Sequence, residues 1–202
     1  GSGLVGSEMC IRDSILTIKG LIRRGEARTA SSYNNIPLDR VHFLDLPFYE
    51  TGKIQKNPIS EADVEIVRNL LREIKPHQIF VAGDLADPHG THRVCTDAVF
   101  AAVDLEKEEG AKWLKDCRIW MYRGAWAEWE IENIEMAVPI SPEELRAKRN
   151  SILKHQSQME SAPFLGNDER LFWQRSEDRN RGTATLYDQL GLASYEAMEA
   201  FV

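Results

Sequence analysis

The sequence predicts an α/β domain with a mostly parallel sheet, and two observations support this prediction. Short, continuously apolar runs such as Gln78–Ala82 alternate with longer segments of helical periodicity, which is the pattern of strands covered on both faces by helices. The order strand, helix, strand at this length fits a parallel crossover. With 202 residues, 43% of them hydrophobic, the chain is long enough for one domain with a real core.

The N-terminal part of the sequence predicts an extension, a helix and a strand. Residues 1–14 carry Gly and Ser at several positions and show no helical or strand period, so we expect a disordered or foreign extension there and a domain over residues 15–202. Apolar residues at helical spacing predict a helix over residues 15–30. Residues 41–46 (VHFLDL) form a short apolar run closed by a proline and predict a buried strand.

The clearest helix is expected after Ser60. Ser60 and Asp63 form a capping signature, and the apolar stripe that follows ends at Pro76. A proline after Ser141 opens another helix, which we expect to run to about residue 158. The remaining pattern predicts a helix around residues 98–105, two helical pieces within 168–202, and strands over 78–82, 117–122 and 131–138, the last at a sheet edge.

Charge and hydropathy exclude several classes of protein. The formal net charge is −7, which disfavours a nucleic-acid-binding surface because phosphate recognition needs clustered positive charge. No apolar stretch approaches the roughly 18 to 20 residues needed to cross a bilayer, and no secretory leader pattern is visible. Three cysteines without CxxC spacing indicate neither a disulfide framework nor a structural zinc knuckle. We therefore expect a soluble, cytoplasmic protein without nucleic-acid or membrane partners.

The densest group of chemically active residues follows the strand at residues 78–82. Ligands of parallel sheets bind beyond the carboxyl ends of the strands, and here that position carries two imidazoles, from His89 and His92. His92 is expected at the start of the next helix. Neutral imidazoles bind zinc, and a carboxylate of Asp84 or Asp87 can orient either ring. A helix capped by a threonine, with both histidines in solvent, explains the same residues equally well.

A second candidate surface follows the strand at residues 117–122. Residues 123–130 combine an arginine, two acidic residues and two indoles. The guanidinium of Arg123 suits a phosphate or carboxylate, and the indole of Trp126 suits the face of a sugar ring. The alternative is that the indoles only cover the end of the sheet.

Several stretches resemble one known family. Residues 86–93 (ADPHGTHR) and 154–158 (KHQSQ) resemble two motifs of the LmbE-like, or PIG-L, family of zinc-dependent N-deacetylases. The stretches LIRRGEAR, HFLDLPFYETG, LREIKPHQIF, DPHGTHRVC and YRGAWAEWEIE resemble the branch that occurs in bacteria as a carboxyl-terminal domain behind a glucosamine-6-phosphate deaminase-like module. The resemblance covers nearly all of residues 15–202.

The resemblance implies a Rossmann-like, mostly parallel sheet flanked by helices, with zinc as the cofactor. It implies His92 as a zinc ligand and His89 as the group that stabilises the developing oxyanion. The family takes its other two ligands and its general base from a His-Pro-Asp-Asp signature after the first strand, and this signature is absent here. We therefore expect an N-terminally truncated domain that lacks its first strand and its metal motif.

Two functions are compatible with these residues. The first is metal-dependent deacetylation of an N-acetylated amino sugar or sugar phosphate, in a chain that is here incomplete, inactive and at most weakly zinc-binding. The second is a non-catalytic accessory or interaction module of a glucosamine-6-phosphate deaminase-like protein in amino-sugar metabolism. The histidine pair favours the first function, and the absent signature favours the second. The expected partners are a small amino sugar and an upstream deaminase-like domain.

Overall fold

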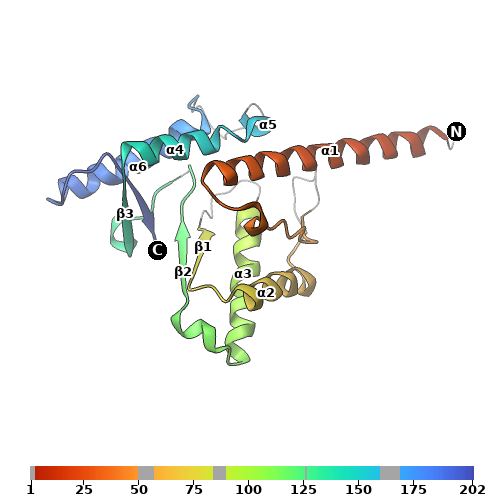
Figure 1. The fold of residues 1–202 in the computed structure, drawn as a ribbon, viewed down its shortest axis with the longest axis horizontal. Coiled ribbons are helices and arrows are strands. Elements are labelled where there is room, and N and C mark those ends of the chain that lie inside the picture. Colours follow the sequence, from red (N-terminus) through yellow and green to blue (C-terminus); the bar gives the residue numbers. More distant parts are fainter. Residues whose placement is uncertain (1–2, 50–56, 84–89, 126, 160–168) are drawn as a thin grey trace. The chain divides into compact units, whose positions relative to one another are not determined.

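The chain divides into two compact units. The structure, a computed structural model, describes residues 3–49, 57–83, 90–125, 127–159 and 169–202 (Figure 1). Unit 1 comprises Gly1–Phe43 and Arg146–Leu171, and unit 2 comprises Leu44–Leu145 and Phe172–Val202. The strands of the described residues all belong to unit 2.

Unit 2 is built on a mixed, four-stranded sheet (Figure 1). β1 and β2 pair in parallel, whereas β4 pairs antiparallel with both β2 and β3. The α/β class is therefore confirmed. The mostly parallel sheet that the sequence predicts is found only in part, because one of these three pairings is parallel and the other two are antiparallel. The strands, which lie in the order β1-β2-β4-β3, are β1 (Gln78–Ala82), β2 (Arg118–Tyr122), β3 (Met136–Ile140) and β4 (Ala197–Phe201).

Three of the four strands lie close to their predicted positions. β1 matches its prediction, β2 begins one residue later than predicted, and β3 lies at a sheet edge as expected. β3 starts later than predicted, because the short 3-10 helix η3 (Ile131–Asn133) precedes it. β4 was predicted as helix and the prediction is wrong. Its alanines and methionine favour helices, but their nearly complete burial inside the sheet outweighs that local preference.

The predicted strand at residues 41–46 is also wrong. The structure describes these residues without regular secondary structure, and Asp45 has a positive φ of 50°, which an extended strand does not tolerate. Leu44 and Leu46 instead pack against the helical core of unit 2. The apolar run is thus explained by burial against helices, without pairing in a sheet.

The helix α2 (Glu61–Ile74) confirms the predicted helix and its cap. Ser60 Oγ accepts a hydrogen bond from Asp63 N, and Asp63 Oδ2 accepts one from Ser60 N at 2.8 Å. Asp63 Oδ1 accepts a third from Phe48 N at 2.8 Å, so this buried carboxylate also fixes the segment before α2. Burial alone would raise the pKa of Asp63, but the hydrogen bonds from Ser60 and Phe48 outweigh it and hold the pKa below its usual value.

The core of unit 2 lies between α2 and α3 (Thr91–Glu108), which pack side by side (Figure 1). Ala98 and Ala102 of α3 are 0% exposed, which is consistent with a close approach of the two helices. Ile79 of β1 packs against the same cluster and joins the sheet to the helix pair. The buried residues of this cluster are Val64, Val67, Leu71, Ala98 and Ala102.

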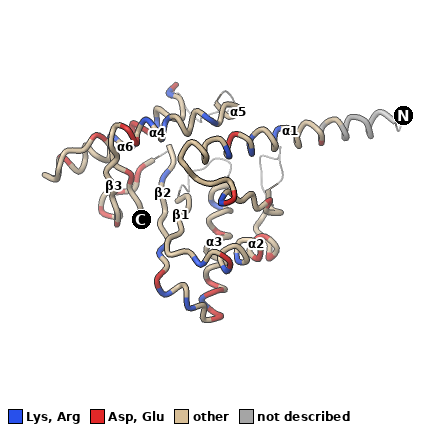
Figure 2. The backbone as a smooth tube through the Cα atoms, in the orientation of Figure 1, with Lys and Arg blue, Asp and Glu red and all other residues tan. Residues whose placement is uncertain are grey.

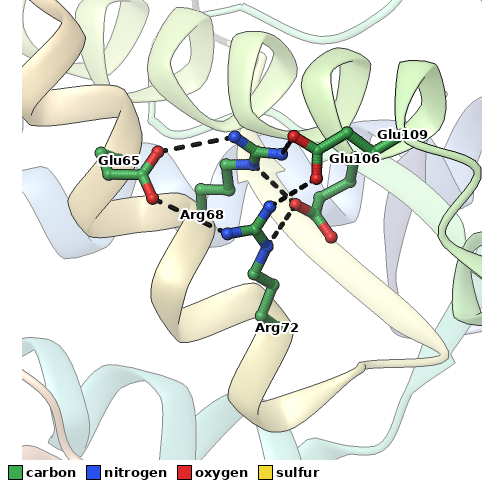
Figure 3. Close-up of polar contacts among 5 residues, drawn as sticks. All are labelled: Glu65, Arg68, Arg72, Glu106 and Glu109. Carbon is green, nitrogen blue, oxygen red and sulfur yellow. Dashed lines mark hydrogen bonds and ion pairs between the residues drawn. The ribbon is translucent and has the colours of Figure 1, made fainter.

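A charged cluster also joins α2 to α3. Glu106 of α3 accepts hydrogen bonds from Nε of Arg68 and Nε of Arg72 on α2, both at 2.6 Å (Figure 3). Glu109 pairs with the same two guanidinium groups at 2.5 and 2.7 Å. The Glu106 side chain is 4% exposed and that of Glu109 is 60% exposed. Basic and acidic residues are interspersed along both helices (Figure 2).

Unit 1 contains the long helix α1 (Gly3–Tyr33), the short 3-10 helix η1 (Leu38–Arg40), most of α4 (Pro142–Ile152) and the short helix α5 (Gln156–Met159). α1 begins at Gly3, before its predicted start at residue 15. Residues 3–14 are therefore helical, which corrects the expectation that they lack regular structure. The foreign origin of residues 1–14 stays a prediction. Among the described residues, no helix is both long and apolar enough to span a membrane.

The long helix predicted over residues 141–158 has the predicted start and an unpredicted break. Pro142 is its first residue, and Ser141 N donates to Glu144 Oε2 at 2.8 Å. The helix stops at Ile152, and α5 begins a new one whose first turn is bound by α1. Glu26 Oε1 accepts from Ser157 N at 2.6 Å and Glu26 Oε2 accepts from Ser157 Oγ at 2.7 Å. A carboxylate at these N–H groups favours a new helix start over a continuous helix.

The stability of unit 2 is expected to fall in acid because of Glu106. Burial alone would raise the pKa of Glu106, but the hydrogen bonds from Arg68 and Arg72 outweigh it and hold the pKa below its usual value of 4.5. The contribution of Glu106 is therefore complete above pH 4.5 and is lost as the pH falls through the lower folded-state pKa. Free energies of unfolding, measured with urea from neutral pH to about pH 3, should fall less steeply for Glu106→Gln.

Glu109→Gln is the matched control for Glu106→Gln. At neutral pH, Glu106→Gln should lower the free energy of unfolding by about 1.5–3 kcal/mol, the usual range for hydrogen bonds to charged groups. Glu109 contacts the same two arginines from an exposed position, so solvent screening should make its substitution much milder. Equal losses from the two variants would contradict the role given to the buried carboxylate.

Candidate functional site

The parallel pairing of β1 and β2 places the carboxyl ends of both strands on the same side of the sheet. This side, formed by strand ends and distinct from the edge strand β3, is the carboxyl edge. Ala82 is the register partner of Tyr122, and Gly83 N donates to Tyr122 O at 2.8 Å. Gly83 and Arg123, the residues directly after the two strands, therefore start from the same edge. Ligands of open α/β sheets bind at this kind of edge.

His92 lies in the first turn of α3, which confirms the predicted helix start. The residue before the helix, Gly90, has a left-handed backbone with a φ of 67°, which glycine adopts without strain. Thr96 Oγ1 donates to Ala82 O at 2.7 Å and so ties α3 to the end of β1. His92 precedes Thr96 by four residues and shares its helix face, with an exposed side chain.

Trp129 lies against both Arg123 and Gly83 at this edge. Cζ of Arg123 lies 4.0 Å from the centroid of the Trp129 ring, which is a cation–π geometry. A Cβ atom built on Gly83 would lie 2.6 Å from Cζ2 of Trp129 and 2.9 Å from Cβ of Met121. Glycine at position 83 thus leaves the space that the indole occupies. The result is a guanidinium and an aromatic ring presented together at the carboxyl edge of the sheet.

Two of the predicted site residues, His92 and Arg123, lie in the described part of this edge. Asp84, Asp87, His89 and Trp126 lie outside the described residues, so their roles stay predictions. Trp129 was not among the predicted site residues, although it is one of the two indoles within residues 123–130. The glycine directly after β1 was the available signal, since a missing side chain at a strand end leaves room for a large ring.

Trp129 is joined to a buried network of charged side chains. Glu128 Oε1 accepts from Trp129 N at 3.0 Å, and Glu128 Oε2 accepts from Arg179 Nη1 at 2.8 Å. Arg179 of α6 (Phe172–Gln189), whose side chain is 6% exposed, also donates to Glu199 of β4. Asn180 Nδ2 completes the network by donating to Glu199 Oε2 at 3.1 Å and to a backbone carbonyl of β4 at 2.7 Å.

Tyr122, the last residue of β2, lies near enough to Glu199 of this network to feel its charge. Although 38% of its surface is exposed, burial of the remainder raises the pKa of Tyr122, and the nearby Glu199 and Cys95 add to this effect. The phenol therefore stays neutral at physiological pH and can donate a hydrogen bond at the sheet edge.

The described donors do not fit zinc, the cofactor that the family resemblance implies. Catalytic zinc sites usually have three protein ligands and a water molecule. Across the described ranges, no group of three His, Cys, Asp or Glu side chains could hold a metal ion. His92 remains a candidate ligand, and zinc at this edge stays a prediction that depends on residues beyond the described ones.

The second motif of the family resemblance, residues 154–158, lies in unit 1. Its Ser157 is bound by Glu26 of α1 through both carboxylate oxygens, at 2.6 and 2.7 Å. Burial alone would raise the pKa of Glu26, but the hydrogen bonds from Ser157 and the nearby charge of His155 lower it below its usual value. These contacts give the motif a structural role, because they hold the first turn of α5 against α1.

Comparison with known proteins gives a near-identical relative. The chain is 98% identical over 195 residues to part of a protein from Bacteroides thetaiotaomicron that is described as a glucosamine-6-phosphate deaminase-like protein. The match covers 96% of this chain and 29% of that protein, so the chain spans less than a third of the relative's length. No family model matches the sequence.

Among solved structures, the fold is similar to that of the conserved protein TT1542 from Thermus thermophilus. The TM-score is 0.53 at 18% identity, and the superposition covers 90% of this chain and 72% of that chain. At this level of identity the similarity concerns the fold alone, and it supports the α/β class.

Gly83→Ala is expected to disturb the sheet edge. The added Cβ would overlap Trp129, so we expect a loss of about 1–3 kcal/mol in the free energy of unfolding, as for other overpacked sites. Displacement of the indole should also change the near-ultraviolet circular dichroism of the folded protein. Urea unfolding and circular dichroism test both effects.

Gly182→Ala is a control for which the free energy of unfolding should change in the opposite direction. Gly182 lies in α6 with nothing within 4 Å of an added Cβ, and alanine in a helix is favoured over glycine by about 1 kcal/mol. This variant should be stabilised and keep its near-ultraviolet spectrum. Tolerance of alanine at position 83 without a spectral change would show that the indole does not need that space.

Proposed function

We propose that this chain is an amino-sugar-binding accessory module within a glucosamine-6-phosphate deaminase-like protein. The observation that supports the proposal is the pairing of Arg123 with Trp129 at the carboxyl edge of β1 and β2. A guanidinium binds phosphate or carboxylate through its planar donors, and an indole face stacks on a sugar ring. The name of the 98% identical relative supplies the ligand class, glucosamine 6-phosphate.

The short share of the relative that this chain represents supports an accessory role. The match spans 29% of that protein, so most of its length lies outside the matched part. In this proposal the chain binds the sugar phosphate, or contacts the deaminase-like part, without catalysing a reaction by itself. An upstream deaminase-like domain is the partner that we propose.

N-deacetylation is a second candidate, and the position of His92 favours it. His92 lies in the first turn of α3, and Thr96 on the same helix face is bound to the end of β1. The LmbE-like resemblance makes His92 a zinc ligand and His89 the group that stabilises the oxyanion. Because the His-Pro-Asp-Asp signature is absent from this sequence, this candidate describes an incomplete, Rossmann-like deacetylase domain that we expect to be inactive as a separate chain.

Glucosamine 6-phosphate is expected to bind the purified chain, as measured by isothermal titration calorimetry. Arg123→Met should weaken this binding by roughly 10- to 150-fold, which corresponds to the loss of one charge-assisted hydrogen bond of about 1.5–3 kcal/mol. Arg118→Met is the control, because Arg118 is exposed at the opposite, amino-terminal end of β2. Absence of binding by the native chain, or equal losses in both variants, would contradict the proposed ligand site.

The two candidate functions predict different zinc contents and different rates of acetate release for the protein. After dialysis against micromolar zinc, the chain is expected to hold clearly less than one equivalent of metal and to release no acetate from N-acetylglucosamine 6-phosphate. The full-length Bacteroides protein, assayed in parallel, separates an incomplete enzyme from a module without catalysis. Stoichiometric zinc in the chain together with acetate release would replace the accessory role by the deacetylase.

A further inference from the structure

Arg179 is a nearly fully buried cation that holds two carboxylates from different segments. Its Nη1 lies 2.8 Å from Oε2 of Glu128, and its Nη2 pairs with Oε1 of Glu199 on β4. The guanidinium donors lie in one fixed plane, so the directions of both carboxylates are set by a single side chain of α6.

Glu128 passes this constraint on to Trp129. Its Oε1 accepts a hydrogen bond from Trp129 N at 3.0 Å, while its Oε2 is shared by Arg179 and the hydroxyl of Thr183. Both oxygens of the carboxylate are engaged, so it cannot rotate without breaking at least one hydrogen bond. The backbone at position 129 is therefore fixed relative to α6.

The position of the Trp129 indole depends on the hydrogen bond between Glu128 and Trp129 N. Its Nε1 is buried and has no hydrogen-bond partner among the described residues. Packing against Gly83 and Arg123, together with the backbone bond to Glu128, holds the ring. A shift of Glu128 would consequently move both the aromatic surface and the guanidinium that lies over it.

We propose that Arg179 is a positioning residue that, through Glu128, holds Trp129 and Arg123 at the carboxyl edge of β1 and β2. A buried ion pair contributes little net stability compared with apolar residues of the same volume, so stability alone does not explain three charged groups at this place. The proposal rests on the proposed function for its ligand, and the position of Trp129 can be measured without any ligand.

The first test follows the indole N–H signal of Trp129 by NMR, in the full chain with isotope-labelled tryptophan. Trp129→Phe assigns the signal. Arg179→Met should shift and broaden it and leave the signal of Trp113 unchanged, and Arg179→Lys should restore part of the native position. Arg181→Met is the control, because Arg181 lies on the same helix in an exposed pair with Glu196.

A milder pair of variants keeps the test valid if Arg179→Met does not fold. The hydroxyls of Thr183 and Thr185 lie 3.0 and 2.9 Å from the carbonyls four residues earlier on α6. Thr183 is buried and also donates to Glu128, whereas Thr185 is exposed. Thr183→Val should therefore move the Trp129 signal, and Thr185→Val should leave it in place.

Titration with glucosamine 6-phosphate adds the functional readout. Arg179→Met and Thr183→Val should weaken binding by about 2- to 30-fold, the usual range for residues that act through a packed network, and both controls should bind as the native chain does. If the native chain does not bind the sugar phosphate while the Trp129 signal still responds, the proposed function fails and the positioning role stands. An unchanged Trp129 signal in the folded variants at positions 179 and 183 would overturn the positioning role.

Discussion

The parallel pairing of β1 with β2 is the constraint on which the candidate site depends. Parallel strands bring their carboxyl ends to one edge, and the register of Ala82 with Tyr122 makes the residues after both strands neighbours. An antiparallel pairing of the same two strands would send Gly83 and Arg123 to opposite ends of the sheet. The contact of Trp129 with both residues exists because of this single pairing.

In unit 2, the buried ion pairs restrict the arrangement of the elements more than the apolar core does. The apolar cluster between α2 and α3 can accept several combinations of residues of similar volume. Glu106, Glu128 and Glu199 each bind a guanidinium in a defined direction, so a shift of helix or strand would leave a charge unpaired. Apolar packing therefore supplies the driving force, and the buried ion pairs select one arrangement of the elements.

Local signals in the sequence predicted the elements whose determinants are local. The capping residues Ser60 and Asp63 are three positions apart, and the structure places both where the pattern predicts. The run Gln78–Ala82 likewise forms its strand, and His92 does begin a helix. In each case the residues that decide the structure lie within a few positions of one another.

Features that depend on distant residues were not predictable in this way. The apolar run at residues 41–46 has the composition of a strand, and only the nearby helices show that it packs without pairing. The break before α5 depends on Glu26, more than a hundred positions away in sequence. Trp129 belongs to the candidate site because it contacts Gly83, and the glycine alone does not indicate which of the two indoles within residues 123–130 fills that space.

The position of β4 has a consequence for how the sheet is assembled. β4 comes after the other three strands in the chain, yet it lies between β2 and β3, which are not neighbours without it. On the ribosome, the β1–β2 pair and β3 therefore remain separate until residues 197–201 have left the exit tunnel. Until then the edges of β2 and β3 that pair with β4 stay open to other nascent chains, and such edges are prone to aggregation. Completion of this sheet is thus delayed by the order of its strands, and a chaperone that shields the open edges would raise the yield of folded protein.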